Sequence, residues 1–104
     1  MSALVEFSMF PTEQTQSKSV FVARILDIVD KSGLGYQLTP MGTIIEGETV
    51  EEVLVIINKA YEELQIDCER IYSSIKIDYR KGPVGRLNRK TGSVEAKLGR
   101  KLKT

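Results

Sequence analysis

Apolar residues alternate with polar ones in two parts of the chain. From Ala3 to Phe10 every second position is apolar on one side, and Pro11 ends the run. Such alternation is typical of a strand with one buried face. The pattern returns from Arg70 to Arg80, where one face consists of Ile71, Ser73, Ile75, Ile77 and Tyr79. We therefore expect a strand near each end of the main body.

Two segments have the spacing of helices. Ser17 can cap a helix that continues through Val29, and Gly33 offers the left-handed residue that commonly ends one. Thr49 and Glu52 have the spacing of a capping box at the start of a second helix. Its apolar residues recur at helical spacing: Val53, Ile57, Ala60, Tyr61 and Leu64. We expect this second helix to pack in the core.

Between the helices the pattern predicts a hairpin. Tyr36–Thr39 and Thr43–Gly47 read as short strands, with Pro40-Met41-Gly42 as the turn between them. The order β-α-β-β-α-β predicts an α+β, ferredoxin-like domain spanning residues 1–104, in which two helices cover one face of a four-stranded antiparallel sheet. The other face is then left for solvent, a ligand or another subunit.

Charge divides the chain into two unequal parts. Residues 1–79 hold 6 basic and 13 acidic side chains, whereas residues 80–104 hold 9 basic and 1 acidic. Residues 81–104 form a basic C-terminal tail, in which Thr91 or Ser93 could begin a short helix. Such a tail suits either a nucleic-acid arm or an end that docks on an acidic body or a neighbouring subunit.

Composition excludes several kinds of site. The chain has no histidine, which removes imidazole bases and histidine-ligated metals, and its single cysteine, Cys68, cannot form an intrachain disulfide. No apolar run approaches the roughly 20 residues of a membrane-spanning helix. The first eleven residues lack the basic start of a secretory signal, so we expect a cytoplasmic protein without membrane partners.

One segment carries a family resemblance. Residues 36–48 read YQLTPMGTIIEGE, and they are accompanied by the first strand, the IKIDYR strand at 75–80 and SVEAKL at 93–98. Together these segments resemble the YkoF-like thiamine-binding protein family. The resemblance implies a ferredoxin-like fold, self-association as a homodimer or homotetramer through the sheets, and binding of thiamine or its hydroxymethylpyrimidine part, with no required cofactor and no known reaction.

The resemblance also implies a set of ligand-binding residues. Thr43 and Glu46, with Gly42 and Gly47 beside them, would line a pocket at the hairpin. Further candidates are Asp78 and Lys76 on the last strand, Ser17 at the first helix, and Tyr36. Carboxylate and hydroxyl groups can meet the amine and ring nitrogens of an aminopyrimidine, and a carboxylate or an aromatic face favours a thiazolium cation.

Each candidate also has a structural interpretation. Glu46 could pair with Lys76, Thr43 could be an ordinary strand threonine, and the glycines could serve turns. Asp78 could belong to a surface salt bridge. Ser17 could act only as a helix cap.

Two other functions compete with small-molecule binding. The basic tail and the open sheet face allow an RNA-binding module, although Glu6 and Asp78 on that face would repel phosphate. Catalysis has less support, because the chain shows no nucleophile constellation, phosphate loop or metal-ligand spacing. We therefore expect a non-enzymatic small-molecule binding protein, with RNA binding as the alternative.

Overall fold

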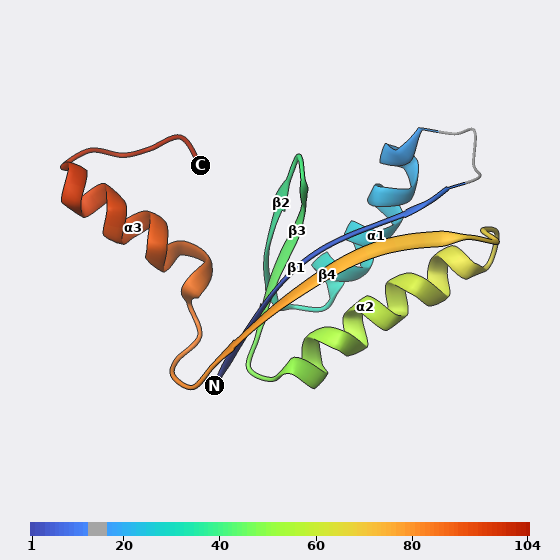
Figure 1. The fold of residues 1–104 in the computed structure, drawn as a ribbon, viewed down its shortest axis with the longest axis horizontal. Helices are drawn as coiled ribbons and strands as arrows, with labels where there is room; N and C mark the ends of the chain where they lie inside the picture. Colours follow the sequence, from blue (N-terminus) through green and yellow to red (C-terminus); the bar gives the residue numbers. More distant parts are fainter. Residues whose placement is uncertain (13–16) are drawn as a thin grey trace.

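The structure is a computed structural model that describes residues 1–12 and 17–104. The order β-α-β-β-α-β agrees with the sequence pattern, and one further helix follows it (Figure 1). The elements are β1 (Ser2–Pro11), α1 (Lys18–Lys31), β2 (Gly35–Thr39), β3 (Gly42–Gly47), α2 (Val50–Gln65), β4 (Ile71–Arg80) and α3 (Arg86–Leu98).

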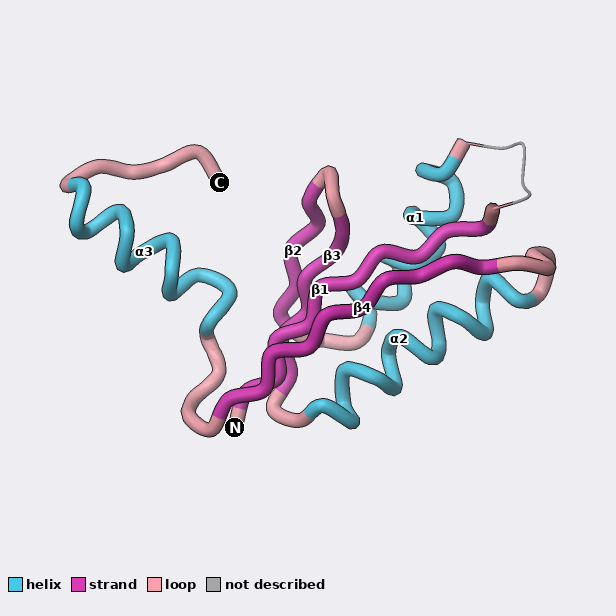
Figure 2. The backbone as a smooth tube through the Cα atoms, viewed as in Figure 1, coloured by secondary structure: helices cyan, strands magenta, loops and turns pink. Residues whose placement is uncertain are grey.

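The four strands form one antiparallel sheet in the order β2-β3-β1-β4 (Figure 2). β1 is central and pairs with β4 along its whole length, from Ser2 to Pro11. Its pairing with β3 is shorter and covers only Ala3–Phe7. The expected ferredoxin-like α+β fold is therefore confirmed, and its central strand extends beyond one of its two neighbours.

The core lies between one face of the sheet and the helices α1 and α2. On β1 the inward positions are Ala3, Val5, Phe7 and Met9, all at most 3% exposed. They join Phe21, Ile25 and Val29 of α1 and the apolar face of α2 in one cluster. We call this side of the sheet the inner face. The opposite side is the outer face.

Both helix starts agree with the expected caps. The Ser17 hydroxyl accepts a hydrogen bond from the N–H of Ser19 at 3.4 Å, and the Thr49 hydroxyl accepts one from the N–H of Glu52 at 3.1 Å. The Glu52 carboxylate reaches back to the N–H of Glu48, one residue before the donor of an ordinary capping box. Each cap satisfies a backbone donor that the first helical turn leaves unpaired.

β4 is less buried than its alternating sequence suggests. Ile77 and Tyr79 have partners in register on the inner positions of β1, yet they are 45% and 47% exposed. β4 is an edge strand, and Ile71 at its start is its partly buried hydrophobic residue that packs against the core. The pattern of alternation is thus correct, while the helical layer does not extend over the far half of this strand.

α3 begins earlier than expected. The sequence predicted a start at Thr91 or Ser93, and this is wrong, because the helix begins at Arg86 and ends at Leu98. Its N-cap is Gly85, which has no side chain to cap the helix. The capping group comes instead from β3, as described below. Figure 1 shows α3 standing apart from α1 and α2.

Candidate functional site

A cleft of about 350 Å³ opens where β1 extends beyond β3. Within the part of the chain that the structure describes, the residues from Ser8 to Pro11 pair only with β4, and no strand lies along their other edge. The turn of the β2–β3 hairpin closes one side and α1 closes another. The fold itself therefore creates the cleft, at the point where the short hairpin ends and the long central strand continues.

The walls of the cleft are mostly apolar. Its apolar lining is Phe7, Met9, Phe10, Val22, Ile25, Leu26, Leu38, Pro40 and Met41. Its polar lining is Ser8, Lys18, Thr39 and Thr43. An apolar cavity with a few polar groups is the usual design of a small-molecule site.

Thr43 is the buried polar residue of this lining. It lies opposite Phe7 in register, which places its side chain on the inner face, and it is only 5% exposed. No hydrogen bond of its hydroxyl is found within the described residues. A hydroxyl in this position has hydrogen-bonding capacity left for a ligand.

The hairpin turn beside Thr43 is held by one hydroxyl and one glycine. The Thr39 hydroxyl donates to the carbonyl oxygen of Gly42 at 2.8 Å and accepts from the N–H groups of Met41 and Gly42, each at 3.2 Å. A Cβ atom on Gly42 would lie 2.9 Å from the carbonyl oxygen of Phe7. Gly42 therefore allows the hairpin to approach β1 closely and fixes this wall of the cleft.

The open side of the cleft carries a cation and two rings. The ammonium of Lys18 lies 4.0 Å from the centroid of the Phe10 ring. Phe10 in turn packs against Tyr72, with ring centroids 5.8 Å apart. Ser17, the residue before Lys18, caps α1 and is exposed next to this opening.

Glu46 lies on the opposite face of the sheet from Thr43. The two residues are three positions apart on β3, so side-chain alternation directs them to different faces. Glu46 is only 7% exposed, and its Oε2 accepts hydrogen bonds from the Ser2 hydroxyl at 2.8 Å and from the N–H groups of Gly85 and Arg86 at 3.0 and 2.9 Å. Its Oε1 accepts from the N–H of Leu87 at 3.4 Å. This carboxylate therefore caps α3.

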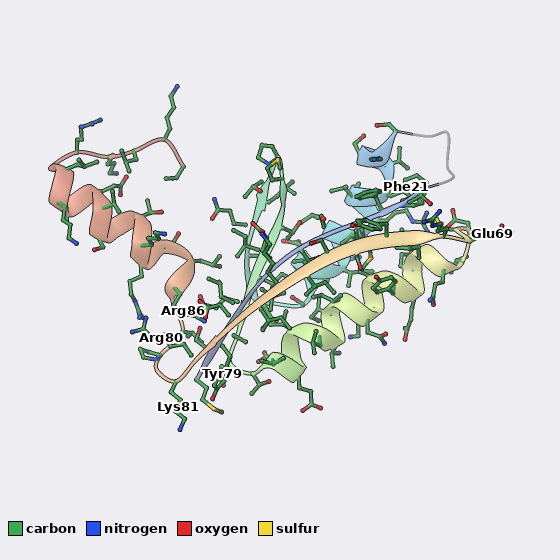
Figure 3. All side chains as sticks on the ribbon, in the orientation of Figure 1. Phe21, Glu69, Tyr79, Arg80, Lys81 and Arg86 are labelled. Atoms are coloured by element: carbon green, nitrogen blue, oxygen red, sulfur yellow. The ribbon has the colours of Figure 1, made fainter. Side chains whose placement is uncertain are left out.

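Arg86 completes the connection between α3 and the sheet, and Figure 3 labels it at the start of the helix. Its guanidinium donates to the hydroxyl of Ser2 at 3.0 Å and to its carbonyl oxygen at 3.1 Å. It also donates to the carboxylate of Asp78 at 2.8 Å and to its carbonyl oxygen at 2.6 Å. We call Ser2, Glu46, Asp78 and Arg86 the α3 anchor.

The charge of Glu46 is stabilised by these bonds. Burial alone raises the pKa of a carboxyl group. Hydrogen bonds from the N–H of Arg86, the hydroxyl of Ser2 and the N–H groups of Gly85 and Leu87 more than offset this, so the pKa of Glu46 lies below its ordinary value. An anion at a helix N-terminus is favoured for the same reason.

The remaining candidates lie outside the cleft. Lys76 forms an exposed ion pair with Glu6 at 3.8 Å on the outer face, so it does not pair with Glu46. Tyr36 donates to the carboxylate of Asp30 at 2.7 Å, near the end of α1, and this hydrogen bond raises the pKa of the tyrosine. Gly47 packs against α2, where a Cβ atom would lie 2.8 Å from Cγ2 of Val53.

The structure thus separates the eight residues expected to bind ligand. It brings Thr43 and Gly42 together in the cleft, with Ser17 beside its opening. Glu46 and Asp78 belong to the α3 anchor. Whether each contacts a ligand stays a prediction, but parity along β3 could already have indicated that Thr43 and Glu46 face different ways.

Thr39 and Lys18 are polar lining residues of the cleft that sequence reasoning did not name as candidates. Thr39 precedes Pro40 at the turn, a position where a hydroxyl commonly bonds to nearby backbone groups, and this signal was available. Lys18 gave no signal, because its place beside Phe10 depends on tertiary structure. Elsewhere in the described residues, no group of three or more metal-binding side chains is found.

Comparisons with known proteins agree with the fold and the motif. The chain is 34% identical over 98 residues to UPF0045 protein Mb1933 of Mycobacterium bovis, which covers 94% of this chain and 96% of the relative. It is 30% identical to UPF0045 protein MJ1052 of Methanocaldococcus jannaschii, covering 88% of this chain and 90% of the relative. No helix in the described part of the chain has the length and apolar character needed to cross a membrane.

Solved structures give the same picture. The crystal structure of MJ1052 superposes with a TM-score of 0.78 at 29% identity, over 89% of this chain and 95% of that one. A candidate thiamine biosynthesis/salvage protein of Thermotoga maritima shares the fold, with a TM-score of 0.77 at 20% identity, over 90% and 99% of the two chains. The family described as thiamine-binding protein matches residues 5–95, and the chain belongs to this family.

Proposed function

We propose that this protein binds thiamine or its hydroxymethylpyrimidine moiety in the cleft, without catalysing a reaction, as a carrier or sensor in the cytoplasm. The observation that carries the proposal is the position of Thr43. This motif residue is only 5% exposed, and its hydroxyl, which has no hydrogen-bond partner among the described residues, is open to an apolar cleft. The membership of the chain in the thiamine-binding family supports the choice of ligand.

The cleft suits a small, flat heteroaromatic ring. Its volume of about 350 Å³ is near the lower end of the roughly 300–1,000 Å³ typical of ligand sites, which favours a small ring system over a large cofactor. The ring would lie between apolar walls, with the Thr43 hydroxyl bonded to a nitrogen or amine of the pyrimidine. The unpaired edge of β1 from Ser8 to Pro11 offers further backbone donors and acceptors.

Glu46 and Asp78 have a different role in this proposal. Both oxygens of Glu46 already accept hydrogen bonds from α3, and Asp78 is bonded to Arg86. A ligand in the cleft lies on the other side of the sheet from these groups. We therefore assign Thr43 and Gly42 to ligand binding, and Glu46 and Asp78 to holding α3.

Calorimetry with one hydroxyl removed tests the ligand and the cleft together. Thiamine and hydroxymethylpyrimidine are titrated into wild type, Thr43→Val and the matched control Thr91→Val, whose hydroxyl belongs to α3. Wild type should bind at least one compound, and Thr43→Val should bind about 10-fold more weakly, as expected for one hydrogen bond. The proposal fails if neither compound binds, or if Thr43→Val matches the wild type.

We also propose that the protein self-associates as a homodimer or homotetramer through α3 and the outer face. The radius of gyration is 15.2 Å, whereas a compact domain of this length has about 13 Å. α3 has no buried residue, and Val94 and Leu98 on it are 37% and 49% exposed. The basic α3 of one copy is opposite in charge to the acidic body of a second copy, so the two attract each other.

Light scattering after size exclusion tests the association. Wild type should have a mass of two or four times 11.7 kDa at micromolar concentration. A double variant, Val94→Lys with Leu98→Lys, should shift it towards monomer, as should removal of residues 87–104. The control Val55→Lys places the same charge on α2, at an exposed apolar residue, and should change nothing. A monomeric wild type would contradict this part of the proposal.

A further inference from the structure

The lining of the cleft carries one charge. Among the described residues that line it, Lys18 is the sole charged side chain, and none is a carboxylate. This is unexpected in residues 1–79, where acidic side chains outnumber basic ones by 13 to 6. The cleft is therefore a locally cationic place on an acidic body.

Two of the other three lysines in residues 1–79 are paired with carboxylates. Lys31 pairs with Asp27 at 2.9 Å, and Lys76 pairs with Glu6 at 3.8 Å. Within the described residues no carboxylate pairs with Lys18, whose ammonium instead lies over the ring of Phe10. The cation is thus held at the opening of the cleft by a neutral partner, and its charge is left for a ligand.

The backbone at the start of α1 carries a partial positive charge, as Lys18 does. Lys18 is the first residue of α1, and the first turn of this helix contains no acidic residue. The first turn of α2, by contrast, contains Glu51 and Glu52. The partial positive charge of the α1 N-terminus therefore adds to that of Lys18 beside the cleft.

We infer that the cleft selects the phosphate esters of its ligand, thiamine monophosphate or hydroxymethylpyrimidine monophosphate, over the free alcohols. This inference rests on the proposed function. The ring lies among the apolar walls beside Thr43, and the phosphate lies at the opening beside Lys18. A phosphate monoester carries about −1.5 to −2 charges at pH 7. Unesterified thiamine has only its thiazolium cation, which Lys18 repels.

Paired titrations separate this inference from the proposed function. Calorimetry at low ionic strength compares thiamine with thiamine monophosphate in wild type, Lys18→Gln, Lys18→Glu and the control Lys59→Gln, an exposed lysine of α2. Wild type and Lys59→Gln should bind thiamine monophosphate at least 10-fold more tightly than thiamine. The preference should disappear in Lys18→Gln and reverse in Lys18→Glu. Added salt should reduce the preference in wild type.

The possible results have distinct meanings. Equal binding of the two compounds by wild type would overturn the inference and leave the proposed function standing. A preference for the phosphate ester that survives in both Lys18 variants would also overturn it. Binding of neither compound would remove the proposed function and this inference with it. All four proteins should have the same circular dichroism spectrum, because Lys18 and Lys59 are exposed.

Discussion

The cleft and the α3 anchor each contain a polar residue of the same motif, Thr43 and Glu46, and the two differ in how many hydrogen bonds the protein makes to them. In the α3 anchor the carboxylate of Glu46 accepts four hydrogen bonds from the protein, and the guanidinium of Arg86 donates to Ser2 and Asp78. In the cleft the hydroxyl of Thr43 has no partner within the described residues. Buried polar groups that are fully satisfied stabilise a fold, while a hydroxyl that is open to a cleft and has no protein partner is available to a ligand.

We expect the largest loss of stability from a substitution that disrupts the α3 anchor. Glu46→Gln keeps the shape of the side chain but removes the charge that faces the backbone N–H groups of α3. We expect the free energy of unfolding to fall by about 1.5–3 kcal/mol, the range for hydrogen bonds to a charged group. Chemical denaturation measures this, and hydrogen exchange should show α3 losing protection. Glu48→Gln, an exposed neighbour, is the control and should leave both unchanged.

Ligand binding provides the second half of that test. If the two regions are independent, Glu46→Gln should bind thiamine or its phosphate ester as wild type does. A loss of affinity equal to that of Thr43→Val would show that the comparison is wrong and that Glu46 contacts the ligand.

Acid should have the same effect on the α3 anchor as the substitution. Because the pKa of Glu46 is lower in the folded protein than its ordinary value of 4.5, its contribution is fully present above that value. It is lost as the pH falls through the lowered pKa. The difference in stability between wild type and Glu46→Gln should therefore be constant near neutral pH. It should decrease towards zero as the pH becomes acidic. A difference that stays constant to pH 2 would contradict the charged cap.

A smaller effect is expected at the wall of the cleft. Gly42→Ala places a Cβ atom 2.9 Å from the carbonyl oxygen of Phe7, so the hairpin must move away from β1. We expect a loss of about 1–2 kcal/mol of stability, as for other overpacked positions, together with weaker ligand binding. The matched control is Gly92→Ala on α3, which meets nothing within 4 Å. Unchanged stability and binding in Gly42→Ala would show that the close approach has no role.

The smallest effect is expected on the outer face. Lys76→Gln removes an ion pair whose two side chains are 79% and 46% exposed. Such pairs contribute less than about 0.5–1 kcal/mol, so stability should change little. Binding should also be unaltered, because Lys76 lies outside the cleft. A clear loss of affinity in Lys76→Gln would extend the site to the outer face.

Local features of the sequence predicted most of the fold. The alternating strands, the caps at Ser17 and Thr49 and the hairpin after Tyr36 depend on residues close together in the chain, and the structure contains them all. The predicted start of α3 was wrong because the group that caps this helix is Glu46, which lies about forty residues before it in the sequence. No local pattern records such a contact.

The candidate site was harder to predict for a similar reason. A motif in one strand indicates which residues are present, but Thr43 and Glu46 face opposite sides of the sheet and meet different elements. Lys18 enters the cleft only because α1 packs beside the free edge of β1. The chemistry of the residues was visible in the sequence, whereas their grouping required the three-dimensional structure.

The cap on α3 has a consequence for the order in which the protein is made. Glu46 belongs to β3, but the N–H groups that it accepts from belong to residues 85–87. At about 5–20 residues per second, a ribosome takes roughly 2–8 s to add the intervening forty residues. During this interval the Glu46 carboxylate has only water and Ser2 as partners. The pairing of β1 with the β2–β3 hairpin can therefore form first, whereas β4 and the backbone groups that bond to Glu46 are both added near the end of synthesis.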